Sequence, residues 1–163
     1  MGEIQMIEEC GDFWIIPADF HCISTNGALR RNGNAVMGKG VALEARNRYH
    51  DLEAILGSLI NKYGNHVFHL GYGLISFPTK YHWRQDGDIE LIKRSAQELV
   101  ILLKDNSAKR VLLTRPGCGN GNLKWSDVKN VIQDILVDNK FIIAHEDYHQ
   151  YQKKVCDHWD DEP

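Results

Sequence analysis

Apolar residues follow two patterns along the chain. Short apolar runs bounded by turn residues predict six strands, at residues 4–8, 20–25, 66–70, 74–77, 110–114 and 141–144. Apolar positions spaced about 3.6 residues apart predict four helices, at 39–49, 52–63, 88–104 and 125–136. Asp88 and Ser126 stand where an N-cap or first-turn residue helps the last two helices begin. This alternation predicts an α/β fold with a parallel or mixed sheet that helices cover on both faces.

Length and composition predict one domain over residues 1–163, with 157–163 as a flexible acidic tail. No apolar stretch reaches the roughly eighteen residues that span a membrane, so we expect no membrane contact. The four cysteines, at 10, 22, 118 and 156, include no CxxC pair, which favours free thiols and the cytoplasm. A net charge of −3 gives no support for wholesale binding to nucleic acid, although five cations and one acidic residue stand between positions 30 and 48.

The first candidate loop follows the strand predicted at 20–25 and leads into a helix. After Asn26 and a polar excursion at 28–35 comes the segment Val36–Met37–Gly38–Lys39–Gly40–Val41. Glycines at a helix start let the backbone approach a ligand, and the free N–H groups with the helix dipole favour an anion. The spacing fits neither a Walker A loop nor a Rossmann fingerprint. An ordinary glycine-rich turn is the alternative for this loop by itself.

A second glycine-rich loop lies between the strand predicted at 110–114 and the last helix. It reads Gly117–Cys118–Gly119–Asn120–Gly121–Asn122. Two such loops can approach a diphosphate from both sides, and closely spaced glycines leave space for a sugar ring. Since structural turns rarely need this many glycines, the two loops together predict a site for a phosphorylated ligand.

A lysine follows the strand predicted at 74–77, in the segment Phe77–Pro78–Thr79–Lys80. Burial of Lys80 among Tyr81, His82 and Trp83 would favour the neutral amine and make it a potential nucleophile or base. A solvated surface lysine is the alternative.

One further motif, from His145 to His149, has the HExxH pattern of zinc proteases. That chemistry needs both histidines on one face of a helix and a third ligand downstream. Because the motif directly follows a predicted strand, we expect no metal site here.

Five segments together resemble the macrodomain family, in register over about residues 4–145. They are Gly11–Asp12–Phe13, residues 19–26, the MGKG loop at 37–40, FPTKxHW at 77–83 and GCGNGxLxW at 117–125. Within the family they are most similar to the antitoxin branch of DNA ADP-ribosyl glycohydrolases, which remove ADP-ribose from thymidine in DNA. The resemblance implies a three-layer fold with a mixed central sheet and helices on both faces. It also implies an ADP-ribosyl hydrolase that acts on modified nucleic acid or protein, without a cofactor.

The resemblance also implies roles for individual residues. Asp12 binds the adenine, the MGKG loop binds the diphosphate, Asn26 faces the distal ribose, and Lys80 is catalytic with Asn26 beside it. The implied ligand-binding residues are Asp12, Phe13, Asn26, Val36, Met37, Gly38, Lys39, Gly40, Val41, Thr79, Gly117, Cys118, Gly119, Asn120, Gly121 and Asn122.

Two departures from the family leave alternatives open. The excursion at 28–35 is longer than in the antitoxins, and Gly121 stands where related glutamate-ADP-ribose hydrolases have an aspartate. A non-catalytic ADP-ribose reader and an ADP-ribose 1″-phosphate phosphatase are therefore alternatives. Lys80 could attack the anomeric carbon or transfer a proton, and we expect the protein to be a monomer.

Overall fold

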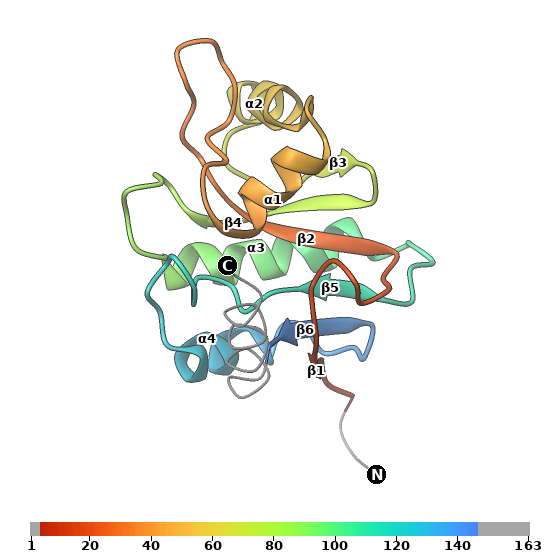
Figure 1. Ribbon diagram of the computed structural model, residues 1–163. Coiled ribbons are helices and arrows are strands. Elements are labelled where there is room, and N and C mark those ends of the chain that lie inside the picture. The colour runs from red at the N-terminus through yellow and green to blue at the C-terminus, as the bar shows by residue number, and fades with distance from the viewer. Residues whose placement is uncertain (1–3, 147–163) are drawn as a thin grey trace, which may run out of the picture.

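The computed structural model describes residues 4–146, which form one six-stranded sheet with four helices (Figure 1). The strands are β1 (Ile7–Cys10), β2 (Phe20–Asn26), β3 (His69–Gly71), β4 (Leu74–Lys80), β5 (Val111–Leu113) and β6 (Phe141–His145). Their order across the sheet is β1-β6-β5-β2-β4-β3, and the pairing is parallel except between β3 and β4. The carboxyl ends of five strands therefore meet at one edge.

The helices are α1 (Gly40–Arg48), α2 (Leu52–Tyr63), α3 (Ile89–Leu102) and α4 (Trp125–Ile132). Strand side chains alternate between the two faces of the sheet: Phe141 and Ile143 pack in one core with α3 and α4, whereas Ile142 packs in the other with α1 and α2. The predicted three-layer α/β fold with a mixed sheet is thus confirmed. No helix within residues 4–146 is long and apolar enough to cross a bilayer.

Several predicted boundaries differ from the observed ones because pairing, not apolarity, sets them. β1 runs from Ile7 to Cys10 rather than over 4–8, since it pairs with β6 from Ile142 to His145. β4 continues past 77 to Lys80, and its polar Thr79 is buried. The strand predicted at 66–70 begins only at 69, because the backbone N–H groups before it donate to side chains. The N–H of Val67 donates to the Glu98 carboxylate, and the N–H of Phe68 donates to the Ser76 hydroxyl.

Helix ends show the same influence of local contacts. Asp88 caps α3 as predicted, its carboxylate accepting the N–H of Leu91 at 3.0 Å. Ser126 lies in the first turn of α4, and that helix ends at Ile132 rather than at 136.

The excursion at 28–35, here called the arginine arm, extends from the end of β2 beyond α2 (Figure 1). The Arg30 N–H bonds the Asn34 carbonyl at 2.8 Å, and Leu29 pairs with Ala35 in an antiparallel bridge. The arm also packs against α2, where a Cβ on Gly57 would lie 2.9 Å from the Ala35 nitrogen. These contacts give the arm a defined position beside the carboxyl edge of the sheet.

Candidate active site

A cavity of about 950 Å³ opens at the carboxyl edge of the sheet. Its walls come from the ends of β2, β4, β5 and β6, the start of α1 and the loop before α4, which Figure 1 shows gathered at the left of the view. A second pocket of about 500 Å³ shares Val41, Thr114, Ala144, His145 and Glu146 with the first. The two pockets therefore adjoin each other at the carboxyl edge, where ligands of α/β sheets commonly bind, and are together called the cleft.

Most of the predicted ligand-binding residues line this cleft. The larger pocket contains Asn26, Val36, Met37, Gly38, Lys39, Gly40, Val41, Thr79, Lys80, Gly117, Cys118, Gly119, Asn120 and Gly121. Asp12 and Phe13 line the smaller one. Asn122 lines neither pocket, since its amide donates to the Asp86 carboxylate at 2.9 Å.

Lys80 lies where three segments of the site meet. It ends β4 opposite Asn26 of β2, just after a shift in the register of that ladder. Its Nζ donates to the carbonyl oxygen of Asn120, in the second glycine-rich loop, at 3.1 Å. The Lys80 side chain thus reaches from the end of β4 to the second glycine-rich loop within the lining of the larger pocket.

The expected burial of Lys80 among aromatic rings is wrong. Lys80 is half-buried, but Tyr81 and Trp83 are 51% and 43% exposed, and His82 is exposed too. The chain leaves the sheet after Lys80 and forms an outward loop before α3. In that loop the Trp83 ring stacks on His82, with ring centroids 5.3 Å apart.

Asn26 holds the first glycine-rich loop in place. Its Nδ2 donates to the Val36 carbonyl at 3.0 Å, and its Oδ1 accepts the Ala28 N–H at 3.0 Å. The side chain therefore ties together both ends of the arginine arm, and its position beside Lys80 also puts it in the pocket.

The start of α1 faces the cavity without a side-chain cap. Lys39 occupies the N-cap position and makes no capping bond, and the first turn contains no acidic residue. Gly40 has a φ of 58°, which favours glycine, and a Cβ on Gly38 would meet no atom within 4 Å. N–H groups at an uncapped helix start are suited to binding an anion.

The three glycines of the second loop have different roles. Gly117 has a φ of 73°, and a Cβ on Gly121 would lie 2.8 Å from the carbonyl carbon of Gly117. These two glycines are needed by the packing of the chain itself, contrary to the expectation that a ligand explains them all. Gly119 is exposed, and a Cβ there would meet nothing within 4 Å. Between them, burial raises the pKa of the Cys118 thiol, partly opposed by Arg115.

The smaller pocket combines a carboxylate with aromatic walls. Asp12 accepts the backbone N–H of Trp14 at 2.8 Å. The Trp14 ring contacts Arg48, whose guanidinium carbon is 4.4 Å from its centroid, and stacks on His21, with ring centroids 5.9 Å apart. Burial lowers the pKa of His21, so the imidazole is neutral near pH 7. A carboxylate next to apolar rings is suited to a planar, hydrogen-bonding heterocycle.

The sequence interpretation missed several residues of the cleft. They are Ser24, Thr25, Leu29, Arg30, Ala42, Trp83, Thr114, Arg115, Leu123, Trp125, Ala144, His145 and Glu146 in the larger pocket, and Trp14, Glu44 and Arg48 in the smaller one. Those at positions 114, 115 and 144–146 end or directly follow predicted strands, so the rule that ligands lie at the carboxyl edge could have indicated them.

A cluster of polar contacts supports Trp125 at the rim. Glu8 of β1 accepts the indole N–H of Trp125 at 2.8 Å and pairs with Lys129 at 2.8 Å. The hydrogen bond from Lys129 is the main reason why the pKa of Glu8 is lowered.

The first histidine of the HExxH segment lies at the end of a strand, not on a helix as in zinc proteases. His145 ends β6 and lines both pockets, and Glu146 follows it, whereas His149 lies outside the described residues. Within residues 4–146 no group of three His, Cys, Asp or Glu side chains could hold a metal ion.

Comparison with known proteins points to one class. No family model matches the chain. A DNA ADP-ribosyl glycohydrolase from Thermus aquaticus is 30% identical over 115 residues, which are 64% of this chain and 32% of that protein. Its namesake from Mycobacterium tuberculosis is 29% identical over 110 residues, 58% of this chain and 30% of that protein. The match thus spans about a third of the length of these curated relatives.

Solved structures agree with this result. The macrodomain of Thermus aquaticus DarG superposes with a TM-score of 0.72 at 25% identity, covering 87% of this chain and 98% of that one. The macrodomain of Mycobacterium tuberculosis DarG gives a TM-score of 0.71 at 24% identity, with the same coverage. The chain therefore has the macrodomain fold. Among macrodomains it is similar to those of the DarG proteins, as its MGKG, FPTKxHW and GCGNG segments predicted.

Proposed function

We propose that this domain is an ADP-ribosyl glycohydrolase, which releases ADP-ribose from a modified nucleic acid. The observation that carries the proposal is the position of Lys80, whose amine lies in the larger pocket and bonds the loop at 117–121 from the end of β4. A binding site alone does not require an amine at that point, whereas cleavage of a glycosidic bond requires a group that attacks or transfers a proton.

The shape of the cleft supports ADP-ribose as the bound group. In this arrangement the adenine lies in the smaller pocket, next to Phe13 and the Trp14 ring. Its amino group donates a hydrogen bond to the Asp12 carboxylate. The diphosphate lies between the uncapped start of α1 and Gly119, and the distal ribose lies toward Asn26 and Lys80. A solved neighbour at 22% identity, the Thermosipho africanus DarTG complex, contains ADP-ribose.

The proposed reaction is hydrolysis at the anomeric carbon of the distal ribose. The glycosidic bond between this carbon and the nucleic acid breaks. The nucleic-acid atom released from that bond takes up a proton, and the carbon receives the oxygen of a water molecule. Lys80 acts in one of two ways: its amine attacks the carbon to give an adduct that water resolves, or it transfers the proton. Asn26 holds the loop on the other side of the reacting sugar.

Nucleic acid is the proposed substrate because the curated relatives are named for acting on ADP-ribosylated DNA. We further infer that the protein acts as a monomer in the cytoplasm, where the thiols of Cys22 and Cys118 remain reduced.

Replacement of Lys80 tests the proposal. Lys80→Ala should keep ADP-ribose affinity within a few-fold in calorimetry, since the residue contributes no identified phosphate contact. It should lose about two or more orders of magnitude in turnover of an ADP-ribosylated oligonucleotide. Lys80→Arg should fail as well, because a guanidinium stays protonated.

Lys93→Ala, which removes an exposed lysine of α3, is the matched control and should retain full turnover. A Lys80→Ala variant as active as wild type would refute the catalytic role. A wild type that binds ADP-ribose but cleaves neither ADP-ribosylated oligonucleotide, ADP-ribosylated peptide nor ADP-ribose 1″-phosphate would be a reader instead.

A further inference from the structure

An exposed group of stacked side chains lies at the mouth of the cleft. We call His82, Trp83 and Arg84 the Trp83 stack: the Trp83 ring lies 5.3 Å from the His82 ring and 4.7 Å from the Arg84 guanidinium carbon. Trp83 lines the larger pocket but is 43% exposed, although tryptophan is generally well buried in folded proteins. The stack therefore presents aromatic surface to solvent three residues after Lys80.

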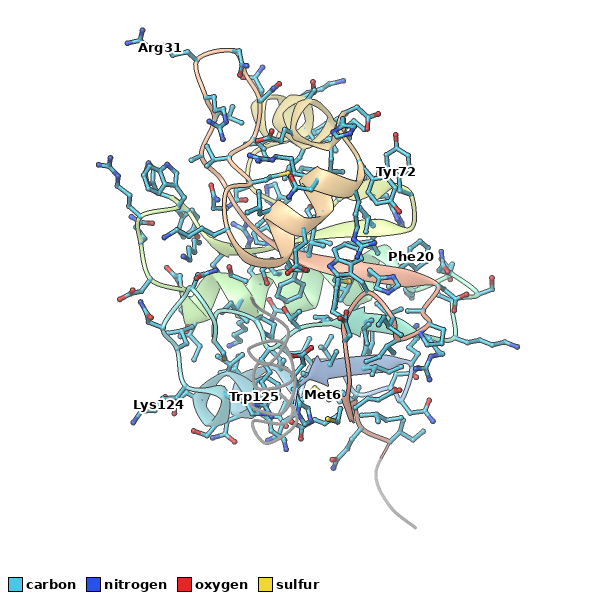
Figure 2. The ribbon with its side chains drawn as sticks, in the orientation of Figure 1. Met6, Phe20, Arg31, Tyr72, Lys124 and Trp125 are labelled. Atoms are coloured by element: carbon cyan, nitrogen blue, oxygen red, sulfur yellow. The ribbon has the colours of Figure 1, made fainter. Side chains whose placement is uncertain are left out.

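The arginine arm lies at the same mouth. Leu29 and Arg30 of the arm line the larger pocket, and Arg31 at its tip extends away from the body of the protein (Figure 2). The segment after β4, which carries the Trp83 stack, extends on the same side of the molecule (Figure 1). The hydrogen bonds within the arm, together with its packing on α2, fix the arm beside the mouth, with Arg30 in the pocket lining and Arg31 beyond it.

Much of the positive charge at this mouth is not neutralised. Arg30 lies 3.6 Å from Glu53, which Arg46 also approaches at 3.9 Å. Among residues 4–146, by contrast, Arg31, Lys39 and Arg84 form no ion pair. The acidic residue of the same segment, Asp86, accepts a hydrogen bond from the neutral amide of Asn122 and is likewise in no ion pair among the described residues. Lys39 in the pocket lining, with Arg31 on the arm and Arg84 on the Trp83 stack, thus supplies cations outside any ion pair on this side of the domain, although the net charge of the chain is −3 and Glu146 also lines the pocket.

We propose that a single strand of nucleic acid crosses this mouth, with a base flanking the modified nucleotide on the Trp83 stack and its phosphates along Arg31, Lys39 and Arg84. The inference rests on the proposed function and specifies how it selects its substrate. Exposed aromatic rings beside cations are typical of surfaces that bind single strands, because every base has a face that can stack. A base paired in a duplex does not present that face, so the strand is single.

Strand binding can be measured without catalysis. Fluorescence anisotropy with an unmodified single-stranded ten-nucleotide DNA at low salt should give saturable binding to the wild type, with an affinity that falls as salt is added. Trp83→Ala should weaken this binding about 5- to 100-fold, the scale of one base–aromatic stack, and Trp83→Phe should restore most of it. Arg31→Glu should weaken binding and reduce the salt dependence. Lys104→Glu makes the same charge change at an exposed residue after the far end of α3 and should bind like wild type.

Turnover provides the second readout. Wild type should cleave an ADP-ribosylated oligonucleotide with a higher kcat/KM than an ADP-ribosylated nucleoside that has no flanking nucleotides. Trp83→Ala and Arg31→Glu should reduce that ratio, mainly through KM for the oligonucleotide.

The outcomes separate the two proposals. The docking surface is overturned if Trp83→Ala and Arg31→Glu bind the single strand as tightly as the wild type does. It is also overturned if these variants lose turnover equally with both substrates, or if the wild type binds a duplex or an acidic peptide more tightly than the single strand. If the wild type binds the strand as expected but cleaves neither substrate, the proposed activity fails while the docking surface stands.

Discussion

The glycines of the second loop provide the sharpest test of which positions need glycine for the packing of the chain and which need it to leave space for a ligand. At Gly121 an added Cβ lies 2.8 Å from both the carbonyl carbon and the Cα of Gly117. These are backbone atoms, which cannot rotate away, and contacts under 3.0 Å are essentially never seen for real Cβ atoms. At Gly119 the same addition meets nothing within 4 Å. One substitution therefore strains the fold, and the other meets only a bound ligand.

The magnitudes follow from this contrast. Overpacking against fixed atoms costs about 1–3 kcal/mol, and for a domain of this size each kcal/mol lowers Tm by roughly 2–4 °C. Gly121→Ala should therefore lower Tm by about 2–12 °C. Gly119→Val should change stability by at most about 0.5 kcal/mol, the usual range for exposed positions. It should nevertheless reduce ADP-ribose affinity at least tenfold, because the branched side chain occupies space meant for phosphate or sugar.

Differential scanning fluorimetry measures the Tm of the two variants, and titration calorimetry measures their affinity for ADP-ribose. Gly38→Val offers the same test in the first loop, where a Cβ is also unobstructed. The reasoning fails if Gly121→Ala melts like wild type, or if Gly119→Val is folded and binds ADP-ribose normally.

Two other predictions concern charged residues. Asp12→Ala should weaken ADP-ribose binding about ten- to a hundred-fold, the value of a charge-assisted hydrogen bond, while ribose 5-phosphate, which has no adenine, binds equally weakly to both proteins in calorimetry. Glu8→Gln removes a carboxylate whose pKa is lowered in the folded state, chiefly by Lys129. Its stabilisation, worth about 0–1 kcal/mol for an exposed pair, is present above the usual pKa of 4.5 and is lost as pH falls. Urea unfolding should separate wild type from variant near neutral pH, and the difference should shrink progressively as pH is lowered below 4.5; a difference that grows in acid would contradict the assignment.

The sequence predicted the order and type of the six strands and four helices found within residues 4–146, because apolar periodicity reports which faces are buried. It could not predict where β1 begins, since that depends on pairing with β6 across most of the chain length. It also placed the two glycine loops and Lys80 at one edge, because parallel strands bring their carboxyl ends together.

What the sequence did not indicate depends on packing between distant segments. The exposure of Trp83, the glycine-to-glycine contact of Gly117 with Gly121, and the support of Trp125 by Glu8 each join positions whose relation no local pattern encodes. Local aromatic neighbours of Lys80 suggested burial for the same reason: proximity along the chain is not proximity in space.

If the proposed ligand binds at the start of α1, it supplies a cap that the chain itself does not. Lys39 contributes no capping bond, as is also true of the N-cap residues of α2 and α4, but those two helices have Glu53 and Asp127 in their first turns whereas α1 has no carboxylate there. A bound phosphate then serves as the missing cap, so that part of the free energy of binding is free energy of helix formation. Amide exchange in the first turn of α1 should slow on ligand binding more than exchange elsewhere, because the ligand joins the secondary structure itself.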